Sequence, residues 1–500
     1  MMTRKADAKL RIAAVALALA AAAAPLLAQQ TPESPAGSGP SMADLEKHLD
    51  DMAARMESMR QELVDSRSEM QAMHAELSEL RREVADKNAA DTGTAVQALR
   101  TSVDHLQETS DVLAAQVQQH DQTKLESASK YPVRIAGTVL FTSLANSGQT
   151  DNVDVPIVAL PAQPHAPDGS FSATARQTIL GLDATGPHFG SASSSASVSV
   201  DFFGGTPYTE TGTAAGLLRL RTAHATLAWS SRALTAAFDR PILSPNEPTS
   251  WITLGEPALA WSGNLWTWAP QFEFRQDLSH GWTAELALID PPAPGSFGSP
   301  GERLPDPAEK SRQPGYEAHL SNAAVLDGRA FAWGAGGYYS RQTYNDGSHL
   351  DAWAATADWS MPLTSSLQIS GAFYRGRGIG GLGGGAFKDY TPYNDYAERE
   401  GLNDEGGWAQ VKWKFSPVLE ANGALGEDNA FAAELRNSDY ATEPDAYQNL
   451  ARNLTAYANF VYRPHTYLLF SAEYRQIRSW PIAGSENQNH IFGLAAGYLF

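Results

Sequence analysis

The sequence predicts an all-β transmembrane antiparallel barrel of about 16 strands, preceded by an α-helical coiled coil. Three features of the 500-residue chain lead to this prediction. A basic and then apolar N-terminus is typical of an exported protein, and a heptad repeat follows it. From Tyr131 to Phe500, apolar residues recur at every second position, which is typical of tilted strands that cross a membrane.

The first 28 residues have the order of a secretory signal peptide. Basic residues from Arg4 to Arg11 precede an apolar, Ala-rich run over 12–28. A retained membrane anchor is the alternative, but the run is shorter than the ~20 residues that a spanning helix needs, and Pro25 would break it. We therefore expect a signal peptide over 1–28 and a flexible, Pro- and Gly-rich linker over 29–44.

Residues 45–125 are predicted to form a periplasmic coiled coil. Apolar residues recur at steps of four and three between Leu45 and Val84, and a weaker repeat resumes at Val96 after a break over 86–94. A lone helix would leave this narrow apolar stripe in water, so the stripe needs a helical partner. The partner is either another copy of the chain in a parallel bundle or the same chain folded back as a helical hairpin.

The barrel is predicted over 131–500. In one typical segment, Trp413 and Phe415 share a face suited to lipid, whereas Lys412 and Lys414 share a face suited to water. The same reading along the chain predicts strands at 132–143, 176–186, 194–204, 216–229, 233–241, 265–277, 281–290, 315–323, 329–341, 350–361, 366–378, 406–416, 418–427, 450–463, 466–480 and 489–500.

The predicted connections alternate between short and long. Turns such as 230–232, 416–417 and 464–465 are short, and connections such as 242–264 and 379–405 are long. Outer-membrane barrels have short periplasmic turns and long extracellular loops. With an even number of strands, the first strand begins and the last strand ends on the same side of the membrane. That side is the periplasm, where the coiled coil is also expected.

The C-terminal segment is an alternating strand with Tyr498 and Phe500 on one face. A terminal Phe on such a strand resembles the signal that the barrel-assembly machinery reads. We therefore expect this machinery and outer-membrane lipid as partners, and the cell outer membrane as the location.

Composition argues against several other functions. The chain has no Cys, which excludes disulfides and thiolate metal sites, and its formal net charge of -19 argues against nucleic-acid binding. Glycines around Gly380 match a dinucleotide fingerprint, but no helical pattern follows them, and no HExxH, GxSxG or P-loop motif occurs. We expect no catalytic residue, no cofactor and no metal site.

A barrel of about 16 to 18 strands leaves an aqueous channel, so the sequence predicts a pore. Charged residues opposite the predicted lipid-facing side chains are the candidates for lining it. They are Arg219, Arg221, Glu273, Arg275, Arg375, Arg377, Lys412, Lys414, Glu473 and Arg475. The basic pairs form either a ladder that draws anions through the pore or ordinary hydrated wall residues offset by acidic loops.

The connection over 242–264 is unusually apolar for an exposed loop. Trp251, Leu254, Leu259 and Trp261 are poorly suited to contact with water. The connection either folds into the barrel or packs against a neighbouring subunit. We predict that it folds inward and acts as a constriction loop.

Three parts of the sequence carry a family resemblance. They are GGWAQVKWKFSPVLEANGALGEDN at 406–429, PALAWSGNLW at 257–266, and YRPHTYLLFSAEYRQIRSWPI at 462–482 with the terminal GLAAGYLF. These parts resemble DcaP-like trimeric outer-membrane porins. The resemblance implies a homotrimer with three separate pores and a helical periplasmic extension. It also implies uptake of small, often negatively charged solutes such as dicarboxylates.

The sequence therefore predicts a porin, a passive diffusion channel for small hydrophilic solutes. Two other functions stay open on the sequence alone. The chain could be a structural outer-membrane tether or adhesin whose coiled coil is the working part. It could also be an outer-membrane enzyme with a Ser, a His and a polar orienting group on the lipid face, which distance in sequence does not exclude.

Overall fold

The computed structural model describes residues 131–500 except 166–167, 206–215, 294–302, 327–328, 392–398, 437 and 444. The predicted signal peptide, linker and coiled coil lie outside the described residues. Among the described residues, no helix is long and apolar enough to span a membrane.

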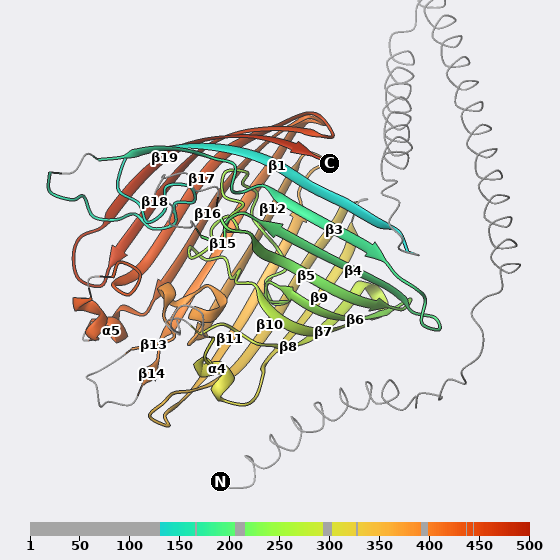
Figure 1. Cartoon of the computed structure of the whole chain (residues 1–500), viewed down its shortest axis with the longest axis horizontal. Helices are drawn as coiled ribbons and strands as arrows, with labels where there is room; N and C mark the ends of the chain where they lie inside the picture. The colour runs from blue at the N-terminus through green and yellow to red at the C-terminus, as the bar shows by residue number, and fades with distance from the viewer. Residues whose placement is uncertain are drawn as a thin grey trace, which may run out of the picture. The chain divides into compact units, whose positions relative to one another are not determined.

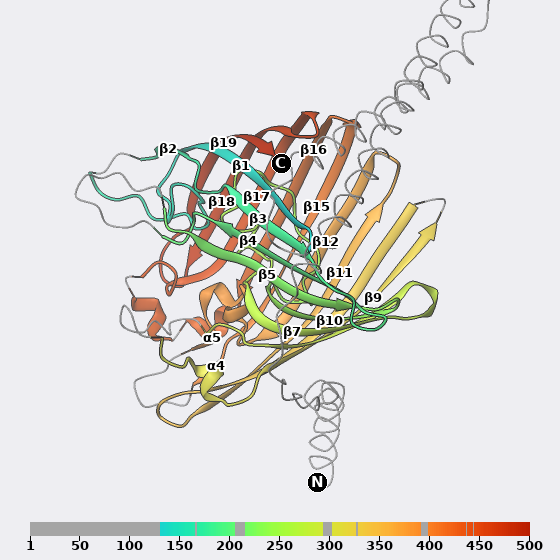
Figure 2. The ribbon, with the colours of Figure 1, turned by 45° about the vertical axis from the view of Figure 1, so that its right-hand side comes forward.

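The described chain forms a closed antiparallel barrel of 16 strands (Figures 1 and 2). Closure comes from β1, which pairs with β19 on one side and with β3 on the other. The strands are β1 (Val133–Asn146), β3 (Ile179–Thr185), β4 (Ser193–Asp201), β5 (Arg219–Ala228), β6 (Arg232–Asp239), β7 (Ala269–Asp277), β8 (Trp282–Ile289), β9 (Gly315–Leu326), β10 (Arg329–Thr343), β11 (His349–Pro362), β12 (Leu367–Arg377), β15 (Asn403–Ser416), β16 (Leu419–Ala430), β17 (Leu450–His465), β18 (Leu468–Pro481) and β19 (Asn487–Leu499).

The predicted fold class is confirmed, and each of the 16 predicted strands overlaps one strand of the barrel. Three further short strands lie within long connections, and the sequence analysis did not separate them. β2 (Ser170–Thr174) pairs with the end of β1, and β13 (Tyr390–Thr391) pairs with β14 (Glu400–Gly401). β2 and β3 together run along β1, interrupted at 175–178.

The two faces of the wall differ in polarity, as period-two strands require. Phe141, Phe460 and Phe492 are each more than half exposed and lie on the outside of the barrel. Asn453 and Asn489 lie on the inner faces of β17 and β19 and are buried by segments inside the barrel. An apolar outer face and a polar inner face are the pattern of a barrel surrounded by lipid.

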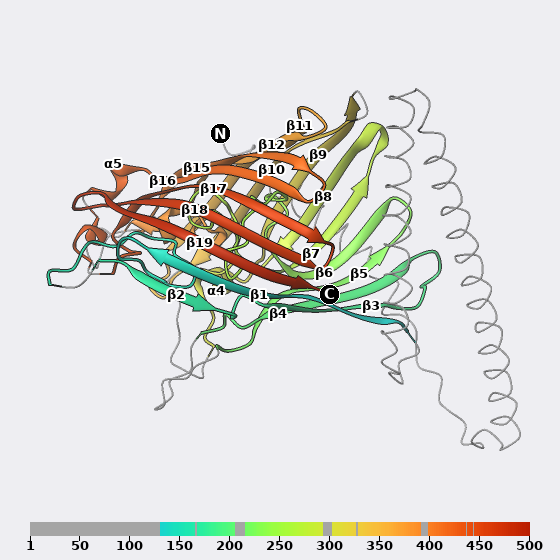
Figure 3. The ribbon, with the colours of Figure 1, turned by 90° about the horizontal axis from the view of Figure 1, so that it is seen from above.

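Long and short connections lie at opposite ends of the barrel (Figure 3). The short turns include η2 (Ser279–Gly281) between β7 and β8 and the tight turn between β15 and β16. The long connections carry the remaining helical elements, namely α4 (Pro307–Lys310), η3 (Gly380–Leu382), η4 (Gly385–Phe387), α5 (Ala432–Leu435) and η5 (Asp439–Thr442). Asp306 begins α4 with a capping box, because its carboxylate accepts from Glu309 N and the Glu309 side chain accepts from Asp306 N.

Glycines on the inner wall make room for segments that pack inside the barrel. A Cβ at Gly493 would lie 2.6 Å from Ile252 Cδ1, and a Cβ at Gly426 would lie 2.2 Å from Ser262 O. A Cβ at Gly336 would lie 2.9 Å from Leu243 Cβ. A glycine inside a strand often marks a close approach of another chain segment, and here the segment is the connection between β6 and β7.

Candidate functional site: the segment that crosses the barrel

The connection between β6 and β7, residues 240–268, runs across the inside of the barrel. We call it the crossing segment. Its first part is held by β11, where Thr356 Oγ1 donates to Leu243 O at 3.1 Å and Asn246 Nδ2 donates to Asp358 Oδ1 at 3.2 Å. Each of these β11 side chains is on the buried, inner face of its strand.

The middle of the crossing segment is held by three strands from β15 to β18. Thr249 N donates to Gln410 Oε1 at 2.6 Å, and its carbonyl accepts from Asn459 Nδ2 at 2.8 Å. Ser250 Oγ donates to Glu473 Oε2 at 2.7 Å. Glu473 also forms an ion pair of 2.7 Å with Arg475, and both side chains are almost completely buried. This buried pair therefore binds the crossing segment, and its charges compensate each other.

The crossing segment then reaches the wall formed by β1 and β19. Ile252 is fully buried in a cluster with Leu140, Leu144, Ile477 and Ile491, against which Trp251 and Leu254 also pack. Burial of this apolar surface stabilises the docked position of the segment. The apolar composition that made 242–264 unusual as a loop is thus accounted for by packing inside the same chain.

Gln177 fixes the crossing segment at this wall through hydrogen bonds. Its side chain is fully buried at the interruption between β2 and β3. Gln177 Nε2 donates to Ile252 O at 2.9 Å, and Gln177 Oε1 accepts from Gly255 N at 2.8 Å. Gln177 Nε2 also donates to Thr142 Oγ1 at 3.1 Å, which ties the interaction to β1.

The returning part of the crossing segment packs against a second infolded segment. Trp261 stacks on Phe387 with ring centroids 3.9 Å apart. Leu259 and Trp261 have positive φ angles of 59° and 58°, a region that non-glycine residues rarely adopt. The strained backbone is held by Ser262, which hydrogen bonds to Thr455 Oγ1 at 2.9 Å.

The second infolded segment is the Gly-rich stretch 378–389 between β12 and β13. Asp404 Oδ2 accepts from Gly385 N at 2.9 Å, and Asp428 Oδ2 accepts from Ala386 N at 2.6 Å. Lys388 is buried and its Nζ donates to Leu450 O at 2.6 Å and to Tyr447 O at 3.1 Å. Burial lowers the pKa of Lys388 to about 7, although Asp428 and Asp404 act in the opposite direction.

Glu256 is the titratable residue of the crossing segment whose carboxyl group lacks a hydrogen-bond partner on one oxygen. Its Oε2 atom is buried and has no hydrogen-bond partner. Burial, reinforced by Asp151, raises the pKa of Glu256 to about 8, and Arg219 and a hydrogen bond from Trp261 only partly oppose this. Burial therefore favours the neutral form of Glu256 in the folded protein.

Arg219 and Arg221 face inward from β5, but they are already paired. Both guanidinium groups contact Asp201, at 2.7 Å and 3.3 Å, and they donate to the carbonyl groups of Gly255 and Leu254. They also lie over the ring of Trp268 at 5.0 and 4.9 Å. These arginines hold the crossing segment against β4 and β5 and retain one unit of uncompensated positive charge.

Glu273, Arg275, Lys412 and Lys414 lie on the inner face nearer the end with the short turns. Arg275 interacts with Glu285 at 3.6 Å, and its side chain is 53% exposed. Lys412 is partly exposed and Lys414 is exposed. The charged side chains of this region are therefore in contact with solvent inside the barrel.

Two of the candidate pore-lining residues were assigned to the wrong face. Arg375 and Arg377 share a face of β12 with the exposed Phe373, and Arg375 lies 5.9 Å from the ring of the exposed Trp353. The inward residue of this part of β12 is Tyr374, which is buried and donates to Asp428 Oδ1 at 2.5 Å. The structure thus places both arginines on the outer side, near the end with the long loops.

The C-terminal residues complete the closure of the barrel. Tyr498 is half exposed on the outer face of β19, and Phe500 exchanges backbone hydrogen bonds with Gly137 at 3.0 and 3.1 Å. A signal for the barrel-assembly machinery at these positions stays a prediction.

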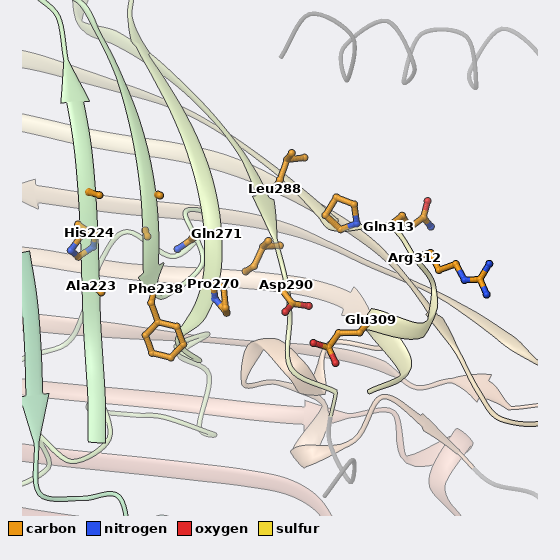
Figure 4. Close-up of a pocket in the computed structure, with 15 residues that line it drawn as sticks. Ala223, His224, Phe238, Pro270, Gln271, Leu288, Asp290, Glu309, Arg312 and Gln313 are labelled. Atoms are coloured by element: carbon orange, nitrogen blue, oxygen red, sulfur yellow. The ribbon is translucent and has the colours of Figure 1, made fainter. Parts of the chain in front are cut away.

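A groove of about 840 Å³ lies outside the lumen, on the outer side of β5 to β8 (Figure 4). Ala223, Phe238, Pro270 and Leu288 line it, and the stretch containing Arg312 overhangs it. Over the described ranges of 131–500, no group of three or more His, Asp or Glu residues is arranged to hold a metal ion.

Closure by 16 antiparallel strands, an apolar exterior and infolded loops define a transmembrane-type β-barrel with a restricted interior. The outer membrane channel DcaP of Acinetobacter baumannii has a similar fold, with a TM-score of 0.58 and 18% sequence identity over 75% of this chain and 99% of that chain. OprB of Pseudomonas putida matches with a TM-score of 0.47 and 9% identity over 74% of this chain and 94% of its own. OmpT of Vibrio cholerae matches with a TM-score of 0.43 and 10% identity over 75% and 99%. No family model and no curated protein sequence matches the chain.

Proposed function

We propose that the protein is an outer-membrane porin, a passive diffusion channel for small hydrophilic solutes. One observation carries the proposal: the barrel has an apolar exposed exterior, and charged side chains inside it, such as Arg275 and Lys414, remain in contact with solvent. Water around fixed charges inside a barrel of this size is the environment that a hydrophilic solute needs to cross a membrane. The crossing segment is the constriction in this proposal.

The finer substrate class that we propose is small solutes with a carboxylate group, including dicarboxylates. Lys412 and Lys414 on one wall and the arginines at 219 and 221 on another supply positive charge on the inner face. Positive charge on a pore wall favours anions. Because Arg375 and Arg377 lie outside and Arg475 is paired with Glu473, the basic ladder is shorter than the sequence suggested.

We also propose that the protein works as a homotrimer, is assembled by the barrel-assembly machinery, and carries the coiled coil on the periplasmic side. In this orientation the short turns face the periplasm, and so do the start of β1 and the end of β19. The resemblance to DcaP-like porins supports these proposals. Light scattering on the detergent-solubilised full chain measures the subunit number, and a monomer mass would reject the trimer.

Liposome swelling tests the channel function. Liposomes that contain the full-length protein should swell in isotonic solutions of small neutral polyols and progressively more slowly as the polyol becomes larger. Liposomes with heat-denatured protein are the control. Absence of swelling with every polyol would reject an open pore and favour a plugged barrel that acts as a tether.

A further inference from the structure

Charge is unevenly distributed in the part of the lumen between the crossing segment and the short turns. We define two sets of inward-facing residues there. The acidic arc consists of the carboxylates of Asp239, Glu273, Asp277, Glu285 and Asp358, and Arg275, His224 and His319 lie among them. The basic arc consists of Lys412, Lys414 and Arg463, and Glu420 lies beside them.

The acidic arc is continuous across neighbouring strands. Arg275 on β7 lies directly opposite Glu285 on β8, which in turn lies opposite His319 on β9. His319 Nε2 lies 2.7 Å from Asp358 Oδ2 on β11. At the other end of the arc, His224 Nε2 on β5 lies 2.8 Å from Asp239 Oδ2 on β6. The arc therefore extends over the wall from β5 to β11.

The basic arc lies across the barrel from the part of the acidic arc on β5 to β7, whereas only β12 separates it from the end of the acidic arc on β11. Around the 16-stranded barrel, β15 is the eighth strand after β5, and β17 is the eighth strand after β7. Lys414 on β15 lies opposite Glu420 on β16, and Arg463 Nη1 on β17 lies 3.8 Å from Glu420 Oε2. In Figure 2 the green strands that carry much of the acidic arc and the orange strands of the basic arc form different sides of the barrel.

The crossing segment lies over both arcs on the side away from the short turns. It contacts the acidic arc where Asn246 donates to Asp358, and it contacts the basic arc where Arg463 lies 5.6 Å from the ring of Trp251. A solute that passes the crossing segment would therefore enter the space between the two arcs. The side chains of Asp239 and Arg463 are 29% and 39% exposed, so water reaches each arc at these residues, whereas His319 and Asp358 are buried.

Neither arc is neutral by itself. The acidic arc contains five carboxylates, one arginine and two histidines. The basic arc contains three cations and has one carboxylate beside it. A field therefore points across the lumen, from the basic arc to the acidic arc. A solute with an amino group at one end and a carboxylate at the other can satisfy both walls at once.

We propose that this part of the lumen favours small zwitterions, molecules that carry a separated ammonium and carboxylate, over dianions and dications of the same length. The inference rests on the proposed channel function and refines its substrate class: among solutes with a carboxylate group, those that also carry an ammonium group enter faster than dicarboxylates. A dianion is repelled by the acidic arc, and a dication is repelled by the basic arc, whereas the zwitterion meets attraction on both sides.

Four solutes with a four-carbon chain test this inference by liposome swelling with the full-length protein at pH 7.5. They are 4-aminobutyrate, succinate, 1,4-diaminobutane and the neutral 1,4-butanediol. We expect 4-aminobutyrate to enter about threefold faster than either doubly charged solute after normalisation to 1,4-butanediol. If 1,4-butanediol itself does not enter, the channel function fails; if it enters and the other three show no such order, only the present inference fails.

Variants of each arc separate charge from shape. Glu273→Gln with Glu285→Gln should remove the advantage over succinate, whereas Lys412→Gln with Lys414→Gln should remove the advantage over 1,4-diaminobutane. Lys310→Gln on α4, outside the barrel strands, is the matched charge control and should keep the wild-type order. Equal effects of both double variants on all charged solutes, or no effect of either, would overturn the proposal. Unchanged entry of 1,4-butanediol in each variant verifies that the barrel is folded.

Discussion

Replacing Gln177 with Ala should release the crossing segment from the β1 wall. The substitution leaves Ile252 O and Gly255 N, both in the crossing segment, without their side-chain partner in a buried position. Each orphaned buried polar group costs about 1–3 kcal/mol, so the docked position weakens by about 2 kcal/mol at least. Because about 1.4 kcal/mol corresponds to a factor of ten, the ratio of released to docked segment should rise by about thirtyfold or more.

Single-channel recording in a planar bilayer measures this release. Gln177→Ala should give more frequent transitions and a larger mean conductance than the wild-type protein. Gln476→Ala is the matched control, because Gln476 lies on the outer face of β18 and makes no contact with the crossing segment. A Gln177→Ala channel with wild-type conductance and wild-type noise would refute the view that these hydrogen bonds hold a constriction.

Three further predictions address charge and packing. Glu256 has a folded pKa of about 8 against 4.5 when unfolded, so the folded state holds more protons in this window and resistance to urea should fall as pH rises from 5 to 8; Glu256→Gln should remove that slope, and an unchanged slope would contradict the assignment. Lys412→Glu should shift the zero-current potential in a salt gradient toward cation preference, whereas Arg375→Glu, on the outer face, should not; equal shifts would place both residues in the pore. Gly493→Val should displace Ile252 and lower stability by about 1–3 kcal/mol in heat-modifiability gels, and an unaltered midpoint would show that the segment is not packed there.

The strands could be predicted because a barrel wall imposes one rule on every strand. Apolar and polar residues alternate along β15 and β19 so regularly that the sequence alone assigns each face. The rule failed at the end of β12, where two adjacent aromatic residues, Phe373 and Tyr374, leave the alternation undecided. Tyr374 is the inward one because its hydroxyl donates to Asp428, a partner 54 residues away that no local pattern identifies.

The contacts inside the barrel were beyond prediction for a related reason. Arg219 and Arg221 both contact Asp201 on the neighbouring strand, next to a register shift in the β4–β5 pair that the sequence does not reveal. Gln177 occupies the interruption between β2 and β3, which the sequence analysis did not resolve as two strands. A usable signal was present in Gly493, because a glycine at an inward position of a strand often indicates close approach of another segment.

The central claim is that a water-filled path runs past the crossing segment, and thiol labelling at Glu247 tests it most directly. Glu247 is an exposed residue of the segment between its anchors on β11 and β15. The chain has no natural Cys, so Glu247→Cys provides a single thiol, with Phe373→Cys on the outer face as control. A negatively charged methanethiosulfonate reagent should reduce the current of Glu247→Cys in steps and leave that of Phe373→Cys unchanged. Complete labelling at Glu247→Cys with an unchanged current would contradict the claim.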